Sequence, residues 1–362
     1  MSAPLYRGVN APPAPARCAH KGLWFERFFN QYDGDFAIPS DGKKKWINTV
    51  ASQGGDTAQL NKAADRQGYL CFALGGQSKV FKTDWHFATG LGNSHPVENG
   101  FAWHPTLGVP YLTGAAVKGL VRAWMEEWHD FGIDDPKQKS LKDWFGSAHK
   151  ADVDTHAGAF IFFDAIPLAP VTLACDVMTP HYGKWYESGG DLKADPTRAE
   201  VVPADWHDPV PVPFLVVKRG SFLFSVAPRD TKDKDKIVAV MEALQNALEW
   251  LGAGAKAAAG YGRFDEDETE NRKLATRTLA RELTALPLDQ RLGKEVASLT
   301  SEQLALMFGR NFTITKNLKA EGWNSFLALV KLTHAATMGG WENSNEGNKK
   351  KAWKKIYGGE ND

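Results

Sequence analysis

Apolar residues recur along the chain at spacings that predict alternating strands and helices. Residues 80–87 alternate in part between apolar and polar side chains, which is typical of a strand. In residues 115–125, five apolar side chains fall on one face of a helix. The expected elements, in chain order, are a strand at 80–87, a helix at 115–125, a strand at 158–164, a hairpin of strands 212–217 and 221–226, a helix at 235–251 and a strand at 261–264.

This order of elements predicts an α+β fold. Strand, helix, strand, strand, helix, strand is the order of a split βαβ domain of the ferredoxin-like or RRM-like kind. We expect this core to occupy residues 76–268. A helical extension with a disordered start is expected at 1–75, and a helical C-terminal extension at 269–362.

A long segment within the core, residues 175–210, has too many prolines, glycines and charges for core strands, so we expect a protruding insertion. It contains His181, Tyr182, Lys184 and Trp185, which place aromatic rings among cations. Such a group suits stacking on nucleic-acid bases or wedging between them. Packing against another protein is the alternative interpretation.

The charge balance excludes a globally basic nucleic-acid coat, because 43 Lys and Arg stand against 43 Asp and Glu. Any RNA site must come from local charge patterning. The three cysteines, Cys18, Cys71 and Cys175, are far apart and predict neither a disulfide framework nor a zinc site. No apolar run reaches the length of about 18 residues that a membrane span needs. We therefore expect a cytoplasmic protein without a cofactor or a membrane partner.

A glycine-rich loop at 252–263 is the clearest candidate binding element. It places Gly252, Gly254, Gly260 and Gly262 around Lys256 and ends on Arg263. Glycine permits positive φ and close approach, so the loop could present amides and two cations to a phosphate chain. A P-loop is excluded because Ala257 follows the lysine, and a dinucleotide fingerprint because a helix precedes the loop. Tight helix packing followed by a turn is the alternative.

A second candidate element is the helix that begins near Thr113 and Gly114. Its first amides are expected to be free, which favours an anion. Lys118 and Arg122, four residues apart, share one face of this helix. They are predicted to contact phosphates, with a merely solvated helix face as the alternative.

Taken together, several ordered segments resemble the RAMP superfamily of CRISPR proteins. They are residues 90–92, 95–100, 108–122 and 252–263, while 163–167 and 176–182 resemble the sixth-subunit family of the type III-B (Cmr) effector complex. One departure concerns the start of the helix, where the usual serine hydroxyls are replaced in Leu112-Thr-Gly-Ala-Ala-Val-Lys-Gly119. Backbone amides and Lys118 would then carry any phosphate contact.

The resemblance implies an RRM-like RAMP core in a non-catalytic RNA-binding subunit. Such a subunit would hold crRNA towards its 3′ portion and touch the guide-target RNA duplex with its insertion. Its partners would be crRNA, target RNA, other RAMP subunits and the small helical subunit. The alternative is a metal-independent RAMP endoribonuclease, with His95 or His181 as general base. Asp164 and Asp176 are expected to be structural acceptors of backbone hydrogen bonds, with nuclease-like carboxylates as the alternative.

Overall fold

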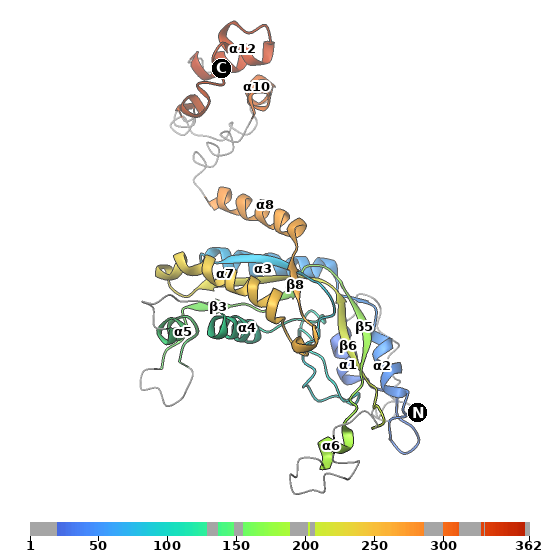
Figure 1. The fold of residues 1–362 in the computed structure, drawn as a ribbon. Coiled ribbons are helices and arrows are strands. Elements are labelled where there is room, and N and C mark those ends of the chain that lie inside the picture. The colour runs from blue at the N-terminus through green and yellow to red at the C-terminus, as the bar shows by residue number, and fades with distance from the viewer. Residues whose placement is uncertain are drawn as a thin grey trace. The chain divides into compact units, whose positions relative to one another are not determined.

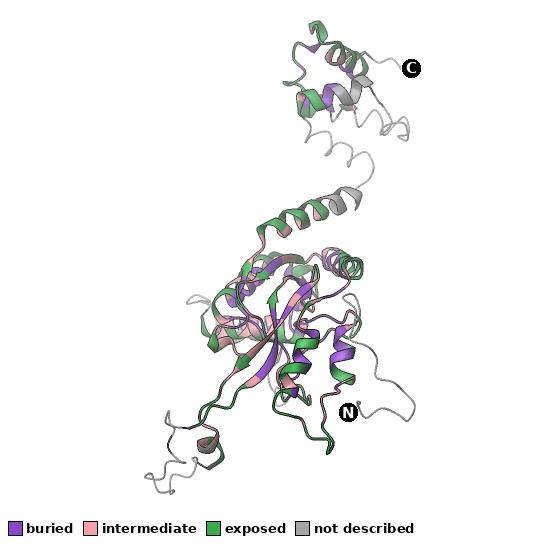
Figure 2. Cartoon of the chain, turned by 90° about the vertical axis from the view of Figure 1, so that its right-hand side faces the viewer, coloured by how far each residue is buried: buried purple, intermediate pink, exposed green. Residues whose placement is uncertain are grey.

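The computed structural model divides into two compact units, Met1–Asn271 and Arg272–Asp362, which are described separately. The residues that the structure describes are 20–128, 137–147, 155–188, 202, 207–285, 300–310, 327–328 and 330–358. Cys18 and the start of the chain that was expected to be disordered lie outside them. Buried residues gather along the strands of the first unit and on the helix sides that face them (Figure 2).

The larger sheet of the first unit has the split βαβ arrangement (Figure 1). Its elements are β2 (Gln77–Thr83), α4 (Gly114–Glu127), β3 (Phe160–Phe162), β7 (Ser221–Pro228), α7 (Ile237–Asn246) and β8 (Phe264–Glu266). The strand order is β3-β7-β2-β8, all neighbours are antiparallel, and β4 (Ile166–Pro167) also pairs with β7. The first strand therefore lies between the third and the last, as in a ferredoxin-like fold. The predicted α+β fold class is confirmed.

Helices cover both faces of this sheet, and its strand β7 is buried along nearly its whole length. Phe222 and Phe224 of β7 belong to the main hydrophobic core, which also takes up the apolar faces of α4 and α7. Ser225 points the other way, because side chains alternate along a strand. There it accepts a hydrogen bond from Gln67 of α3 (Thr57–Ala73), 3.2 Å away. The sheet is thus a central layer between α3 and the α4–α7 pair.

A second sheet corrects the predicted hairpin. It has the order β1-β5-β6, with β1 at Gln53–Gly54, β5 at Val171–Met178 and β6 at Val212–Arg219. β6 pairs with β5, whereas β7 joins the larger sheet, so the chain changes sheet at Gly220. The physical reason is that β6 is buried on both faces: Leu215 and Val217 enter the main core, and Phe214 and Val216 form a second cluster. A strand apolar on both faces has to be covered on both.

The N-terminal helices pack beside this second sheet. They are α1 (Lys21–Arg27) and α2 (Gly42–Val50), and Trp24 stacks on Trp46 with ring centroids 4.1 Å apart. Both tryptophans are buried in the main core, which also contains residues of β5 and β6. The helical N-terminal segment is therefore part of the first unit and shares its core.

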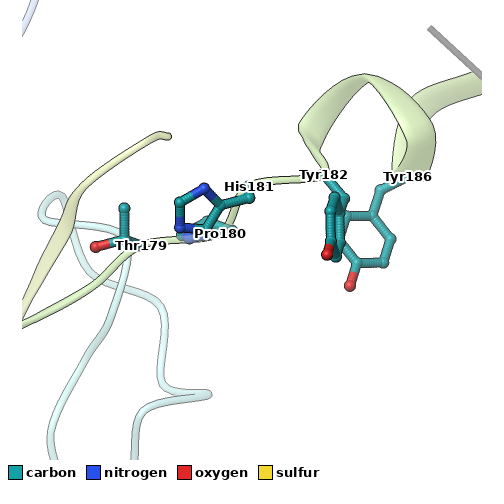
Figure 3. A pocket seen from close by; sticks show the side chains of 5 residues that line it. All are labelled: Thr179, Pro180, His181, Tyr182 and Tyr186. Carbon is teal, nitrogen blue, oxygen red and sulfur yellow. The ribbon is translucent and has the colours of Figure 1, made fainter. Parts of the chain in front are cut away.

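The insertion leaves the second sheet at the end of β5. Residues 175–178 belong to that strand, so the predicted start of the insertion at residue 175 is too early, and the segment outside the strand begins after Met178. After Met178 the chain forms α6 (Gly183–Ser188) beside a hollow of about 390 Å³ lined by Thr179, Pro180, His181, Tyr182 and Tyr186. The side chains of Tyr182 and Tyr186 point away from α6 in the same direction (Figure 3).

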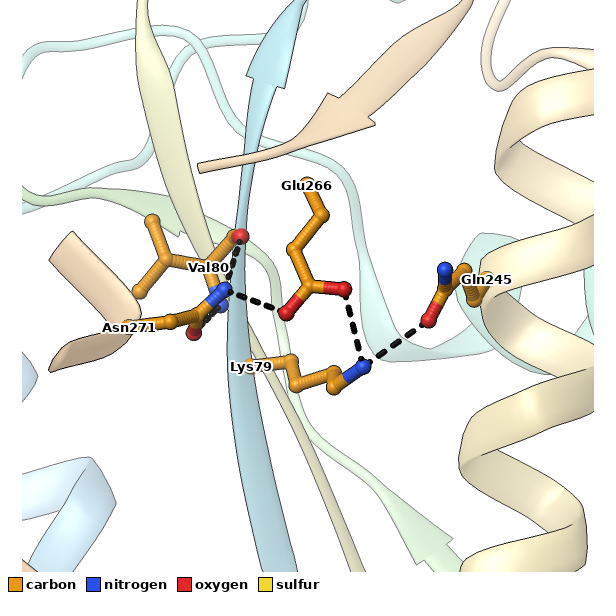
Figure 4. Close-up of polar contacts among 5 residues, drawn as sticks. All are labelled: Lys79, Val80, Gln245, Glu266 and Asn271. Atoms are coloured by element: carbon orange, nitrogen blue, oxygen red, sulfur yellow. Dashed lines mark hydrogen bonds and ion pairs between the residues drawn. The ribbon is translucent and has the colours of Figure 1, made fainter. Parts of the chain in front are cut away.

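Asn271 completes hydrogen bonding along β2 where β8 ends (Figure 4). Its side-chain oxygen accepts from the Val80 amide at 2.8 Å, and its nitrogen donates to the Val80 carbonyl at 3.0 Å. The same nitrogen donates to Glu266, which also pairs with Lys79 at 3.1 Å. The Asn271 side chain, in the first turns of α8 (Glu268–Ala285), thus bonds the two backbone groups of Val80 in the way that a residue of a neighbouring strand would.

We expect Asn271→Ala to lower the free energy of unfolding of the first unit by about 1–2 kcal/mol, because the Val80 amide loses its partner and the Val80 carbonyl keeps only the Asp267 amide. The measurement is a denaturant titration followed by far-UV circular dichroism. Asn61→Ala, an exposed position on α3, is the control and should change stability by less than about 0.5 kcal/mol. Equal stability of both variants would contradict this role.

The second unit is helical where it is described, and the division into a C-terminal extension at 269–362 stays a prediction. It contains α10 (Ser301–Arg310) and α12 (Gly347–Tyr357), and Met338, Trp341 and Ile356 are buried in it. Residues 272–362 carry fifteen Lys and Arg against nine Asp and Glu, a net charge of +6. The overall balance of zero therefore leaves −6 on residues 1–271. Of the helices described, none is both long and apolar enough to cross a bilayer.

Candidate nucleic-acid interface

The glycine loop is anchored to the chain segment that follows β2. It begins after the helical turn Ala247–Leu251. The Ala255 amide donates to the Ala88 carbonyl at 2.8 Å, and the Gly262 amide donates to the His86 carbonyl at 2.8 Å. Across the loop, the Ala253 amide donates to the Gly262 carbonyl at 2.7 Å. The loop is therefore held in one conformation by the protein itself.

Three of the four predicted glycines are required by this packing. A Cβ at Gly262 would lie 1.9 Å from the Ala253 carbonyl oxygen, and one at Gly254 would lie 2.2 Å from that of Ala88. At Gly252 the nearest atom, the Tyr261 carbonyl oxygen, is 2.9 Å away. The room that the sequence pattern suggested for a ligand is thus occupied by the loop's own backbone. Gly260 differs, since it needs only its φ of +90° and faces open space.

The tip of the loop still presents groups that suit a phosphate. Among the residues described, the amides of Lys256, Ala257 and Ala258 make no hydrogen bond to another protein group. Lys256 has a φ of +60°, and its ammonium lies 5.6 Å from the centroid of the Phe214 ring. Arg263 is exposed. We therefore retain, as a proposal, the prediction that amides and cations of this loop contact phosphates, and we restrict the amides to those at the tip.

The start of α4 corrects a further expectation. Its first amides are not free: the Gly114 amide donates to the Asp164 carboxylate at 2.6 Å, and the Ala116 amide donates to Thr113 Oγ1 at 3.2 Å. The protein's own carboxylate thus occupies the place expected for a bound anion. Asp164 acts as the acceptor of a backbone hydrogen bond, the structural role expected for it.

The cations of α4 form a separate group with Arg229. Burial lowers the pKa of Lys118, and the nearby positive charges of Arg229 and Arg122 lower it further. Arg122 is not fully available, because its Nε lies 2.6 Å from Glu126 one turn later. An RNA phosphate close to this group would relieve the repulsion among the three cations.

The structure does not bring the two predicted phosphate-binding groups together. Arg229 directly follows β7, beyond the pairing of Val226 with Gln77 at the start of β2. The glycine loop leads into β8 beside Thr83, at the other end of β2. The α4 cations and the loop tip are therefore two patches at different ends of the sheet, and only an extended ligand could reach both.

The predicted residues of the insertion lie in α6 or directly before it. His181 is exposed, Tyr182 is partly buried, and both line the hollow described above. Trp185 meets Tyr186 edge to face, with centroids 5.0 Å apart. Lys184 lies in α6, but its side chain is outside the described part of the structure. The aromatic cluster forms, and its contact with RNA stays a proposal.

His95, one of the two suggested general bases, is partly buried against Phe25. Its Nε2 lies 2.9 Å from the Phe25 carbonyl oxygen, and its ring stacks on Phe25 with centroids 4.2 Å apart. Burial lowers the pKa of His95. His95 is half-buried, and both the Phe25 carbonyl and the Phe25 ring engage it, which disfavours a role as general base. In the described ranges, no group of three or more His, Cys, Asp or Glu side chains is placed to hold a metal ion.

A polar cluster beside the glycine loop was missed by sequence reasoning. Asp176 of β5 accepts hydrogen bonds through one oxygen from His86 Nδ1 at 2.9 Å and from the Tyr261 hydroxyl at 2.8 Å. Its other oxygen accepts from the Val177 amide at 2.8 Å. Trp85 stacks on His86 at 4.7 Å, with an interplanar angle of 8°. No spacing rule could find this cluster, because its members are 85 and 90 residues apart.

The cluster shifts two pKa values in opposite directions. Burial alone would raise the pKa of Asp176, but the hydrogen bonds from His86, Tyr261 and the Val177 amide outweigh it and hold that pKa below its ordinary value. Burial, followed by the hydrogen bond to Asp176, raises the pKa of Tyr261 to about 12. The carboxylate stays ionised and the phenol stays protonated over the whole neutral range.

We expect Tyr261 to ionise only well above the ordinary pKa of a tyrosine. Because its folded pKa is raised, its contribution to stability is present below the ordinary tyrosine pKa of about 10 and is lost as pH rises through about 12. The measurement is a spectrophotometric titration at 295 nm of the protein and of Tyr261→Phe. The difference between the two curves should appear near pH 12. A difference centred near pH 10 would show that neither burial nor the hydrogen bond to Asp176 raises the pKa of Tyr261.

A sequence profile of the RAMP superfamily matches residues 80–265. This segment contains the split βαβ sheet, α4, the insertion and the glycine loop. The chain belongs to the RAMP superfamily.

Among characterised proteins, the chain is similar to the CRISPR system Cmr subunit Cmr6 of Pyrococcus furiosus, with 29% identity over 240 residues. The match covers 51% of this chain and 66% of the relative, slightly less than two thirds of that protein's length. The resemblance to the RAMP superfamily and to its sixth Cmr subunit, seen in the motifs, is thereby confirmed as a similarity.

Two solved structures show a weaker similarity. One is a chain of a type III-B Cmr-beta complex bound to cognate target RNA, with 19% identity and a TM-score of 0.43 over 62% of this chain and 70% of that chain. The other is crystalline Cmr6 from Pyrococcus furiosus, with 24% identity and a TM-score of 0.29 over 53% of this chain and 97% of that chain. At these scores the family assignment rests on the sequence match.

Proposed function

We propose that this protein is a non-catalytic, RNA-binding subunit of a type III-B CRISPR effector complex. In this role it holds crRNA towards its 3′ portion and contacts the guide-target duplex through the insertion around α6. Its partners are crRNA, target RNA, other RAMP subunits and the small helical subunit, in the cytoplasm. The similarity to a Cmr subunit supports the proposal that this protein belongs to such a complex. The RAMP domain supports the proposal that it binds RNA.

The observation that carries the RNA-binding proposal is the tip of the glycine loop. Residues 1–271 have a net charge of −6, so a polyanion needs a local site on this unit. The loop tip supplies one, with the Lys256 ammonium, the exposed Arg263 and three unpaired amides. Contacts of this kind fix the position of a backbone and carry no sequence information, as a subunit that holds any guide requires. The Lys118, Arg122 and Arg229 group is proposed as a second phosphate patch.

The test is binding of a labelled single-stranded RNA to the purified full chain, followed by fluorescence anisotropy at increasing salt. We expect the logarithm of the RNA affinity to fall steeply and linearly with the logarithm of the salt concentration. The reason is that contacts to phosphates release the counterions that are bound to free RNA. An RNA affinity that salt does not change, or no binding at low salt, would overturn the proposal. A purely structural subunit that meets only protein would give the second result.

We expect no discrete cleavage of labelled CRISPR repeat RNA by the purified protein in EDTA. His95 is half-buried with its Nε2 at the Phe25 carbonyl, and His86, the imidazole next to the glycine loop, is held by Asp176 and stacked on Trp85. The exposed His181 is the other suggested base. Gel analysis of the RNA checks this. Discrete products that disappear in His95→Ala, His181→Ala or His86→Ala would favour the metal-independent endoribonuclease instead.

A further inference from the structure

Trp85 is a large apolar side chain exposed beside the glycine loop. It remains 48% exposed although it lies next to the hydrogen-bonded cluster of His86, Asp176 and Tyr261. One face of its indole is covered by the His86 ring, at 4.7 Å and nearly parallel. Exposure alone does not set Trp85 apart, since Trp128 and Trp250 are more exposed. What distinguishes Trp85 is that its indole stacks on a ring that is itself held by a hydrogen bond to Asp176.

The other face of the indole is not covered by the same cluster. The Tyr261 centroid is 4.9 Å from Trp85 and 6.3 Å from His86. A ring on the face opposite His86 would be much farther from His86 than that, so the two rings do not sandwich Trp85. Tyr261 instead lies tilted by 47° towards the side of the indole.

The supporting ring is fixed by hydrogen bonds. His86 Nδ1 lies 2.9 Å from Asp176, whose two oxygens are both engaged by protein donors. Asp176 belongs to β5, and Tyr261 to the glycine loop, so three separate segments determine the plane of the imidazole. A flat ring whose orientation is set in advance loses little conformational freedom when another ring stacks on it.

The same segments lead directly to the loop cations. The Asp84 amide, one residue before Trp85, donates to the Arg263 carbonyl at 3.0 Å. The Tyr261 amide donates to the Lys256 carbonyl at 3.3 Å. The exposed carboxylate of Asp84 and the ionised Asp176 make the immediate surroundings of Trp85 unfavourable for a phosphate. An uncharged, flat group fits there, with phosphates beyond it at the cations.

We propose that the open face of Trp85 stacks on a nucleobase of the single-stranded RNA whose phosphates contact Lys256 and Arg263. This inference rests on the proposed RNA-binding function and adds to it a base platform, formed by Trp85 on His86. Stacking on an indole accepts any base, which suits a site that holds guides of different sequence. His86 is a positioning residue, since it acts through Trp85.

The experiment compares two fluorescein-labelled oligomers of equal length, one of uridines and one of ribose-phosphate units without bases. Both are titrated against the full-length protein, Trp85→Ala, Trp85→Phe and Tyr69→Ala. Tyr69 is an exposed aromatic residue on α3 and serves as the matched control. We expect the protein and Tyr69→Ala to bind oligouridine about tenfold more tightly than the abasic strand. Trp85→Ala should lose this preference, while Trp85→Phe should keep most of it.

The outcomes separate this proposal from the one on which it rests. If the unmodified protein binds neither strand, the RNA-binding function itself fails. If it binds both strands and Trp85→Ala retains the full preference for uridines, RNA binding stands and the base platform is wrong. The second result would also be expected if Trp85 packed against a neighbouring subunit.

A further pair of variants tests the positioning role of His86. His86→Phe keeps a flat ring under Trp85 and is expected to retain the preference for uridines, whereas His86→Ala should reduce it severalfold. Both remove the hydrogen bond to Asp176, so a loss of stability alone would affect both alike. Equal loss in the two variants would overturn the role of His86 as a supporting ring.

Discussion

Gly262→Ala is expected to lower the free energy of unfolding of the first unit by about 3 kcal/mol or more. The new Cβ would lie 1.9 Å from the Ala253 carbonyl oxygen, and backbone atoms cannot rotate away as a flexible side chain can. The φ of +74° adds strain for any residue with a Cβ. The loop would have to give up its hydrogen bonds to Ala253 and His86.

The matched control for this substitution is Gly260→Ala in the same loop. Gly260 also has a positive φ, +90°, but no atom lies within 4 Å of the added Cβ. Gly260→Ala should therefore lower the free energy of unfolding only by the cost of the left-handed conformation, about 1–2 kcal/mol. Denaturant unfolding followed by circular dichroism measures both. If the two variants were equally stable, the packing role assigned to Gly262 would be wrong.

The second large effect is expected for Lys256→Ala combined with Arg263→Ala. If both side chains contact RNA phosphates, we expect the affinity for single-stranded RNA at low salt to fall roughly tenfold to a hundredfold. The slope of log affinity against log salt should decrease by about 1.4, since each phosphate contact on a single strand contributes about 0.7. Fluorescence anisotropy at several salt concentrations gives both quantities.

Two comparisons make this result specific. Lys62→Ala removes an exposed lysine on α3, on the other side of the sheet, and should leave affinity and slope nearly unchanged. Lys118→Ala tests the α4 patch separately, because the structure places it away from the loop. An unchanged slope in the double variant would show that Lys256 and Arg263 are not phosphate contacts, whatever the stability of the loop.

Local patterns predicted the order of the elements well. Apolar spacing in 115–125 and 235–251 predicted the two helices of the split βαβ fold, because these helices cover one sheet face with one apolar side. The same reasoning failed for 212–217. Residues on its two faces enter two different hydrophobic clusters, and the strand pairs with β5. The short connection to the next strand had suggested a hairpin, which does not form.

The candidate site was predicted only in part, for the same physical reason. The glycines of 252–263 and their cations are contiguous in sequence and could be seen there. The partner of the first α4 amide, Asp164, is 50 residues away, so the expected free amides were wrong. Trp85, His86, Asp176 and Tyr261 come from three segments, and their grouping depends on how two sheets pack.

By itself, the sequence determined the split βαβ order, the family and the glycine loop with Lys256 and Arg263. These features depend on neighbouring residues and on short-range backbone preferences. Only the tertiary structure decided that the loop fills its own glycine-lined space, that the α4 cations lie at the other end of β2, and that Trp85 is mounted on His86. Each of these depends on contacts between residues far apart in the chain, which packing sets and local sequence patterns do not encode.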